Sequence, residues 1–305
     1  MSVTKDDETY PRKILQYMEG FLISKTLFAA CELGVFDHLE TAERPLSAAE
    51  VAQGLGSSED GTRRLLSACA GLELLTVQQC NNQELAVVEV VRWRHVTLRV
   101  KTIPRGVGSD EEMLKFMHLM NSIWNICSKD VVTAFDLTPF KIIYDLGGCS
   151  GALAKQCTVA YPGSTVTIFD LPKVVHMSRK YFVSSQDKRI SFHEGDFFKD
   201  ELPEANLYIL ARILHDWTDE RSSELLDKVY RSCSPGGGVL LVEALLHEDG
   251  SGPLTAQLYS LNMLVQTEGR ERKASEYACL LTAAGFTNIQ VQRTGKIYDA
   301  ILARK

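Results

Sequence analysis

Apolar side chains recur at helical spacing through the first part of the chain. In the segment 11–39 they stand three and four residues apart, which predicts two amphipathic helices joined near residues 20–25. Further on, Ser47 precedes Glu50 by three residues, a capping box that predicts the start of a short helix. The spacing of 64–72 predicts a second helix, and a strand-like run follows it. Helix, turn, helix and strand in this order are typical of a winged helix.

The middle of the chain changes character twice. Residues 77–108 are rich in valine, with arginines interleaved among the apolar positions, and this period of two predicts a strand or hairpin. From Asp110 to Phe135 the helical spacing returns. One apolar stripe on this helix predicts a core-facing side, made of Phe116, Met120, Ile123, Trp124 and Cys127.

The second half alternates short β-branched runs with helix-length segments. Five such runs begin at residues 142, 164, 190, 207 and 236. Strands that alternate with helices predict a parallel sheet covered on both faces, because the right-handed crossover closes in that way. The tail predicts one more helix over 275–284 and two closing strands at the sheet edge. The expected fold class is therefore α/β, with a Rossmann-like, mostly parallel sheet and an N-terminal, mainly helical winged-helix unit.

Charge and composition narrow the possible partners. A winged helix often binds DNA, with Arg63 and Arg64 as phosphate contacts, but a net charge of -6 favours solvated arginines in a protein-interaction module. Eight scattered cysteines without a CxxC pair are typical of reduced thiols in a cytoplasmic protein. No apolar run approaches the roughly 18 residues that span a bilayer. We expect neither nucleic acid nor membrane as a partner.

Candidate chemistry lies just after the predicted strands, where open parallel sheets bind ligands. The first strand ends in the glycine turn 147–151, whose glycines allow a nucleoside to approach the backbone. Asp170 ends the second strand, where a carboxylate can accept hydrogen bonds from both ribose hydroxyls. Asp196 and Phe197 follow the third strand, in place for an adenine amino group and ring face. The turn lacks the lysine of a phosphate-binding loop, so a nucleoside without phosphate fits it.

His215 follows the fourth strand and is the candidate general base, because an imidazole with a pKa near 6.5 accepts a proton at neutral pH. The alternative is a histidine packed at a helix start. Glu243, a carboxylate within an apolar run, requires a partner, and His215 is the candidate. No ligand cluster with the spacing of a metal site appears, so we expect no metal.

Six motifs, in this order and spacing, resemble those of the small-molecule O-methyltransferases that use S-adenosylmethionine. They are DLGG, IFDLP, EGDFF, ILARILHDW, PGGGVLLVE and LYSLNMLVQTEGRER. The run PEANLYILARILHDW and the terminus YDAILARK are similar to those of the family members that make melatonin. The resemblance covers roughly residues 10–76 and 111–305. It implies a dimerisation domain over 1–76, an atypical linker over 77–110 and a methyltransferase domain over 111–305.

The resemblance also implies the roles of single residues. It implies methyl transfer from S-adenosylmethionine to the hydroxyl of N-acetylserotonin by a cytoplasmic homodimer. His215 would be the base, flanked by Glu243 and Glu271, and Asp216, Asn262 and Gln266 would meet the indoleamine. The expected cofactor contacts are Trp124, Gly147, Asp170, Gly195, Asp196, Phe197 and Arg212. Asn262 and Gln266 stand one helical turn apart, where both amides can reach an acetamide, although without the resemblance a solvated helix face is the favoured interpretation.

Two features depart from the family. Cys149 replaces a glycine in the turn, where a side chain is expected to press on the nucleoside or to force the backbone off a positive φ. The segment 77–110 does not resemble the family, and about forty residues of the usual connection are missing. Three hypotheses stay open: an active methyltransferase dimer, a catalytically impaired member that acts only as a dimerisation partner, and a winged-helix nucleic-acid binder.

Overall fold

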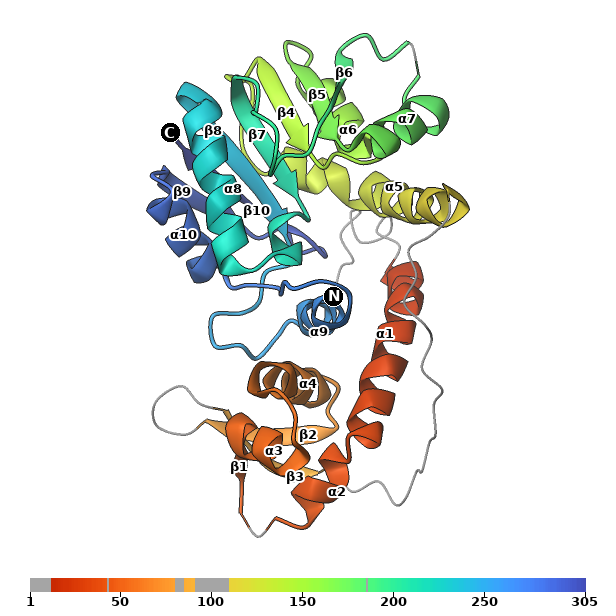
Figure 1. Cartoon of the computed structure of the whole chain (residues 1–305), viewed down its shortest axis with the longest axis vertical. Coiled ribbons are helices and arrows are strands. Elements are labelled where there is room, and N and C mark those ends of the chain that lie inside the picture. The colour runs from red at the N-terminus through yellow and green to blue at the C-terminus, as the bar shows by residue number, and fades with distance from the viewer. Residues whose placement is uncertain (1–11, 43, 80–84, 91–109, 185) are drawn as a thin grey trace, which may run out of the picture. The chain divides into compact units, whose positions relative to one another are not determined.

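The computed structural model describes residues 12–42, 44–79, 85–90, 110–184 and 186–305, which fall into two compact units (Figure 1). Unit 1 comprises Met1–Pro104 and Leu245–Lys273, and unit 2 comprises Arg105–Ala244 and Ala274–Lys305. The expected methyltransferase domain over 111–305 thus differs from unit 2 in two places: unit 2 begins at Arg105, and it lacks the segment 245–273. That segment contains a helix that packs on the helices of unit 1.

Unit 1 is mainly helical and has a small antiparallel sheet of order β1-β3-β2. Its elements are α1 (Arg12–Glu32), α2 (Val35–Glu40), β1 (Leu46–Ser47), α3 (Ala48–Leu55), α4 (Glu59–Gly71), β2 (Leu75–Gln79), β3 (Leu85–Val90) and α9 (Leu254–Gln266). Its core joins residues from α1 to β2, among them Ala30, Val35, Val51, Leu65, Leu66 and Cys69.

Local signals in unit 1 are confirmed in part. The capping box at α3 is present, because Ser47 Oγ accepts from the Glu50 N–H and the Glu50 carboxylate accepts from the Ser47 N–H. The predicted break near residues 20–25 is wrong. Helix α1 runs on through Gly20, since one glycine costs a helix only about 1 kcal/mol. The chain turns instead at Gly34, which adopts a left-handed φ of 72°.

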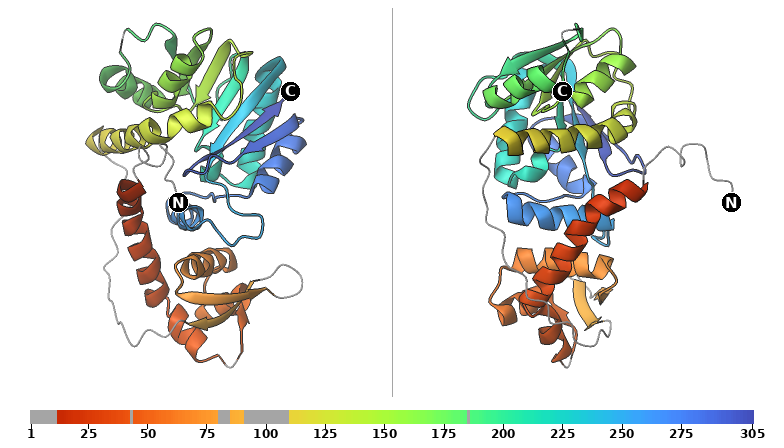
Figure 2. Two further views of the ribbon diagram at one scale, coloured as in Figure 1. Left: turned by 180° about the vertical axis from the view of Figure 1, so that it is seen from behind. Right: turned by 90° about the vertical axis from the view of Figure 1, so that its right-hand side faces the viewer.

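Unit 2 is a seven-stranded sheet of order β6-β5-β4-β7-β8-β10-β9 with helices on both faces (Figure 2). The first five strands are parallel, and β10 runs antiparallel to both β8 and β9. The strands are β4 (Ile142–Leu146), β5 (Thr165–Asp170), β6 (Ile190–Glu194), β7 (Ala205–Ala211), β8 (Cys233–Glu243), β9 (Thr287–Gln292) and β10 (Asp299–Arg304). The helices are α5 (Asp110–Val132), α6 (Ala152–Ala160), α7 (Pro172–Tyr181), η1 (Leu214–Asp216), α8 (Asp219–Ser232) and α10 (Ala274–Ala283). The predicted α/β fold is confirmed.

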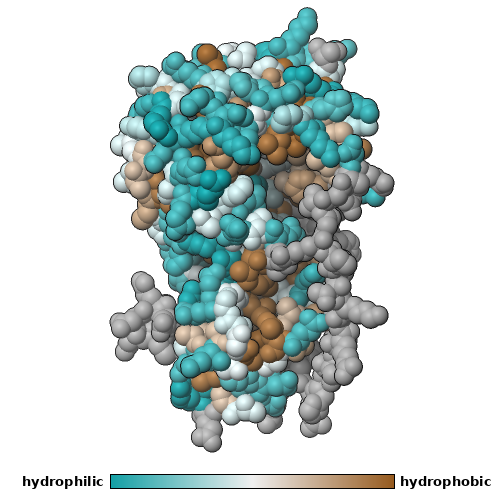
Figure 3. All heavy atoms as spheres, in the orientation of Figure 1, coloured by the Kyte–Doolittle hydropathy of each residue, from teal (hydrophilic) through white to brown (hydrophobic). Residues whose placement is uncertain are grey.

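Burial follows the sequence pattern with one exception on α5. The inward side of α8 buries Leu225, Leu226 and Val229, while its outward side is hydrophilic (Figure 3). On α5, Ile123 and Trp124 are buried as predicted, but 58% of Phe116 is exposed, so the predicted core stripe is wrong at that end. In the described part of the chain, no helix combines the length and the apolar character that a membrane span requires.

Candidate active site

The glycine turn after β4 forms a tight backbone loop. Gly147 and Gly151 have φ values of 70° and 74°, in the left-handed region that favours glycine. A Cβ on Gly147 would lie 2.4 Å from Ile213 Cδ1, so the turn also needs a residue without a side chain. Cys149 adopts a φ of 49°. The expectation that its side chain forces the backbone off a positive φ is therefore wrong, although a non-glycine residue in this region carries a conformational cost.

Asp170 at the end of β5 holds this turn. Its Oδ2 accepts the Cys149 N–H at 2.9 Å, and its Oδ1 accepts the Leu171 N–H at 2.8 Å. Burial raises the pKa of Asp170, while the two N–H donors oppose that rise. A carboxylate has about four lone-pair sites. Asp170 therefore keeps acceptor capacity for hydroxyl groups of a ligand.

A second carboxyl, Asp145, lies buried beneath the same turn and was not anticipated as a site residue. It is 1% exposed, and its Oδ2 has no hydrogen-bond partner within the described chain. A Cβ on Gly148 would lie 2.7 Å from this oxygen, so the glycine leaves room for it. Burial, and to a smaller extent the charge of Asp170, raises the pKa of Asp145 to about 8. Asp145 is therefore mainly protonated at neutral pH.

The residues after β6 lie beside these groups. The Gly195 N–H donates to the Asp170 carbonyl at 3.0 Å, and a Cβ on Gly195 would meet the Phe169 ring at 2.5 Å. The Asp196 carboxylate accepts from the Phe198 N–H at 3.0 Å and pairs with Lys199 at 2.8 Å. Lys199 and the N–H donors lower the pKa of Asp196. Its carboxylate thus stabilises its own turn, which leaves the expected contact to an adenine as a prediction.

Phe197 and Trp124 supply aromatic surface within unit 2. A Cβ on Gly147 would lie 3.9 Å from the Phe197 ring, which places that ring beside the glycine turn. Trp124 on α5 is buried against Tyr298, with ring centroids 5.2 Å apart. Tyr298 in turn lies under the Arg212 guanidinium at 5.1 Å. Sequence reasoning assigned Tyr298 no role, although it opens the terminal motif YDAILARK.

Arg212 joins His215 to Glu243 at the ends of β7 and β8. Its Nη1 donates to Glu243 Oε2 at 3.1 Å, and its Nη2 lies 2.9 Å from His215 Nδ1. Glu243 Oε1 accepts the Leu214 N–H at 3.1 Å. The arginine and glutamate side chains are 7% and 0% exposed. Glu243 thus has Arg212 as a direct partner, which the sequence did not suggest.

This arrangement sets the state of the imidazole. A guanidinium only donates hydrogen bonds, so His215 Nδ1 accepts and the ring hydrogen of the neutral form lies on Nε2, 3.5 Å from Asp216 Oδ1. Proton acceptance at Nε2 requires the other tautomer, with its hydrogen on Nδ1. A carboxylate oxygen of Glu243 and a ring nitrogen of His215 lie within 4.8 Å of one another, so a negative charge lies beside the imidazole. The positive charge of Arg212 opposes a metal ion at this position.

The remaining predicted site residues belong to unit 1. Asn262 and Gln266 lie on α9, where Gln266 Nε2 donates to Asn262 Oδ1 at 2.9 Å, so the two amides share one helix face as predicted. Glu271 follows α9 and is 1% exposed. Its backbone N–H donates to Ser260 Oγ at 3.3 Å. The expected roles of these three residues stay predictions.

Comparison with known proteins identifies both parts of the chain. An O-methyltransferase domain model matches residues 98–287, and an O-methyltransferase dimerisation domain model matches residues 15–112. The chain is 51% identical to the acetylserotonin O-methyltransferase of Gallus gallus, over 98% of this chain and 99% of the relative. It is 44% identical to the acetylserotonin O-methyltransferase of Homo sapiens, over 99% of each chain.

Solved structures agree with these matches. Human N-acetylserotonin methyltransferase in complex with SAM matches with a TM-score of 0.65 and 42% identity, over 100% of this chain and 99% of that one. An O-methyltransferase family 2 protein from Planctomyces limnophilus in complex with apigenin matches with a TM-score of 0.74 and 25% identity, over 96% of this chain and 95% of that one. With the family models covering both parts of the chain and relatives aligned over nearly its whole length, the chain belongs to the O-methyltransferase family.

Proposed function

We propose that this chain transfers the methyl group of S-adenosylmethionine to the hydroxyl oxygen of N-acetylserotonin and so forms melatonin. The observation that carries the proposal is the 44–51% identity, over nearly full length, to acetylserotonin O-methyltransferases. The Arg212–His215–Glu243 group, at the ends of β7 and β8 in the same sheet as β4, adds a proton acceptor with buried charged neighbours.

The residues at the strand ends suit S-adenosylmethionine. Asp170 has acceptor capacity for the ribose hydroxyls, and the turn 147–151 presents backbone rather than bulky side chains. Two buried polar atoms at this turn, Asp145 Oδ2 and Ser150 Oγ, have no partner among the described residues. The other proposed cofactor contacts are Gly147, Gly195, Asp196, Phe197, Arg212 and Trp124. The bound cofactor supplies a methyl group that is already activated on a positively charged sulfur.

The protein then has two tasks: to align the acceptor oxygen and to remove its proton. Alignment lowers a barrier by about 7 to 11 kcal/mol, whereas a positioned base contributes typically 10² to 10⁴-fold, so alignment is the larger effect. The pKa of a free phenol is near 10 and that of an imidazole near 6.5, so prior deprotonation is costly. The proton moves to His215 as the O–CH₃ bond forms and the S–CH₃ bond breaks, and no metal takes part.

The likeness to the O-methyltransferase family also supports a set of acceptor contacts and a homodimer. Asp216, Asn262 and Gln266 hold the indoleamine, and the two amides, which share one face of α9, bind its acetamide. Glu243 and Glu271 stabilise the imidazolium that forms. The dimerisation domain model over residues 15–112 supports a homodimer. The seven described cysteines are free thiols, which supports a cytoplasmic location.

The impaired-member hypothesis rests on Cys149 and on the segment 77–110. The turn forms with Cys149 in place, and the Cys149 N–H still reaches Asp170. This geometry favours an active enzyme. Most of the linker segment lies outside the described residues.

Calorimetry and kinetics on the full chain test the proposal together. We expect wild type to bind S-adenosylmethionine and to methylate N-acetylserotonin. His215→Ala should lower turnover by about 10² to 10⁴-fold with cofactor affinity within twofold of wild type. His247→Ala, at a loop histidine outside the proposed site, is the matched control and should behave as wild type. Equal loss of turnover and cofactor affinity in His215→Ala would show a structural histidine instead of a base.

A further inference from the structure

Arg64 on α4 differs sharply from its neighbour Arg63. The Arg64 side chain is 12% exposed, whereas 53% of the Arg63 side chain is exposed. Arg63 pairs with Glu59 and Asp60 on its own helix. The expectation that both arginines are solvated is confirmed for Arg63 and wrong for Arg64, because the sequence pattern does not show which helix covers that side of α4.

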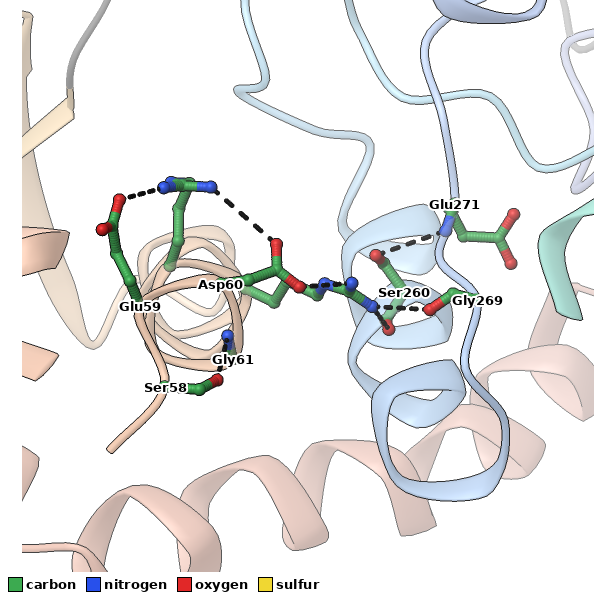
Figure 4. A network of polar contacts seen from close by, with 9 residues as sticks. Ser58, Glu59, Asp60, Gly61, Ser260, Gly269 and Glu271 are labelled. Carbon is green, nitrogen blue, oxygen red and sulfur yellow. Dashed lines mark hydrogen bonds and ion pairs between the residues drawn. The ribbon is translucent and has the colours of Figure 1, made fainter. Parts of the chain in front are cut away.

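The Arg64 guanidinium binds the backbone of α9 and of the segment that follows it. Its Nη1 donates to the Gly269 carbonyl at 2.8 Å and to the Ser260 carbonyl at 3.3 Å. Its Nη2 donates to Asp60, one turn earlier on α4. Figure 4 shows Asp60 on α4 facing Ser260 and Gly269 across this network. One planar guanidinium thus connects a helix carboxylate with two carbonyls more than 190 residues away in sequence.

Two glycines allow α4 and α9 to pack closely at this point. A Cβ on Gly61 would lie 3.1 Å from Leu264 Cδ2, and one on Gly71 would lie 2.2 Å from Gln257 Oε1. Gln257 also donates to Ser67 Oγ at 3.4 Å. These contacts hold the first and last turns of α4 on α9, so the Arg64 contacts lie within a packed helix pair.

The bound segment carries three residues of the proposed function. Asn262 and Gln266 lie on α9 itself, and Glu271 lies two residues after Gly269. The Glu271 N–H donates to Ser260 Oγ, while its carboxylate points away from the network (Figure 4). The Ser260 carbonyl therefore accepts a hydrogen bond from the Arg64 guanidinium, and the Ser260 hydroxyl accepts one from the Glu271 N–H. Through this residue and Gly269, the guanidinium fixes the backbone on both sides of the turn that leads to Glu271.

We propose that Arg64 is a positioning residue for methyl transfer: it holds α9 and residues 267–271 as one rigid piece and so orients Glu271, Asn262 and Gln266 toward the acceptor. This inference rests on the proposed function, because those three residues act on the acceptor only in that account. Arg64 touches neither substrate nor reacting atoms.

The test compares Arg64→Ala and Arg64→Lys with Arg63→Ala in the full chain. Arg63→Ala is a matched control, since it removes a neighbouring charge that shares the partner Asp60 and whose ion pairs in the described chain are with residues of α4. Arg64→Lys keeps the positive charge, but one ammonium does not reproduce the planar fork. Three quantities are measured: hydrogen exchange of the backbone amides at 267–273, acceptor kcat/KM, and the Kd of S-adenosylmethionine by calorimetry.

For Arg64→Ala we expect amide exchange at 267–273 to rise at least tenfold and acceptor kcat/KM to fall by about 10 to 100-fold. The cofactor Kd should stay within twofold of wild type, because the proposed cofactor contacts lie in unit 2. For Arg64→Lys, amide exchange and acceptor kcat/KM should lie between the values of Arg64→Ala and wild type. Arg63→Ala should match wild type in all three measurements. If Arg64→Ala does not fold, Arg64→Lys decides by the same three measurements.

Several results would overturn the inference. Faster exchange with unchanged acceptor kinetics would show a purely structural contact, and so would equal losses of acceptor and cofactor binding. If Arg63→Ala changed amide exchange and acceptor kcat/KM as much as Arg64→Ala does, the cause would be the loss of a positive charge and not the loss of the Arg64 contacts. Failure of the proposed function is a separate result, in which wild type itself methylates no N-acetylserotonin. The inference about Arg64 would then fail together with the proposed function, whatever the amide exchange rates are.

Discussion

At the scale of single residues, the site depends on buried charged and protonated groups whose neighbours determine their state. Asp145 stays protonated because burial and Asp170 oppose its ionisation. Arg212 and Glu243 form an ion pair in which both side chains are almost fully buried. Such groups are costly to leave without partners, so single substitutions here have large and distinct effects.

Asp145 should make the stability of unit 2 depend on pH. Its folded pKa of about 8 lies above the ordinary value of 3.8, so the folded state keeps a proton that the unfolded state releases. The stability that this retained proton contributes is fully present below the unfolded pKa and is lost as pH rises toward about 8. The stability of Asp145→Asn relative to wild type should therefore increase from pH 5 to 8 and level off above it. Urea unfolding followed by tryptophan fluorescence measures this, and parallel pH curves for the two proteins would contradict it.

Loss of Arg212 should destabilise unit 2 strongly. Arg212→Met leaves the Glu243 charge buried without its guanidinium partner, which costs typically about 3 to 5 kcal/mol. The double variant Arg212→Met/Glu243→Gln removes both charges and should recover part of that loss. Chemical unfolding of the four proteins in this cycle checks the expectation. Additive losses in the double variant would show that the two side chains do not depend on each other.

At the scale of elements, the turn between β4 and α6 requires glycine for two separable reasons. Gly147 needs both a positive φ and space beside Ile213, whereas Gly236 has a φ of 76° with open space around it. Gly236→Ala should therefore cost only the left-handed conformation, about 1 kcal/mol. Gly147→Ala should cost about 1 to 3 kcal/mol more through crowding, and it should weaken cofactor binding. Thermal unfolding and calorimetry compare the two variants, and equal effects would show that Ile213 moves aside freely.

Much of the element structure was predictable because it depends on local patterns. The alternation of strands and helices between residues 142 and 243 and the capping box at Ser47 involve neighbours in sequence. The continuous α1, the partly buried Arg64 and the place of α9 in unit 1 depend on tertiary packing, which periodicity does not encode. Likewise, Arg212 was expected to contact the cofactor, but its bridge between His215 and Glu243 requires a φ of 60° that no sequence pattern indicates.

At the scale of the whole molecule, the account requires a dimer built through unit 1. The dimerisation domain model covers α1, where 60% of Phe21 is exposed. Light scattering after size exclusion should give twice the chain mass of 34.0 kDa. Phe21→Asp should shift the equilibrium toward monomer, because it places a charge on an apolar surface. Val159→Asp, at a residue of α6 that is 69% exposed, is the control outside the dimerisation model and should leave the mass unchanged. A monomeric wild type would contradict the proposed assembly.

The most direct test of the central claim follows the methyl group itself. Purified chain is incubated with methyl-labelled S-adenosylmethionine and N-acetylserotonin, and the product is analysed by mass spectrometry beside the same reaction with His215→Ala. The account predicts a product one labelled methyl group heavier, carried on the former hydroxyl oxygen, that forms at least about 10²-fold more slowly with the variant. No labelled product from wild type, or equal rates from both proteins, would contradict it.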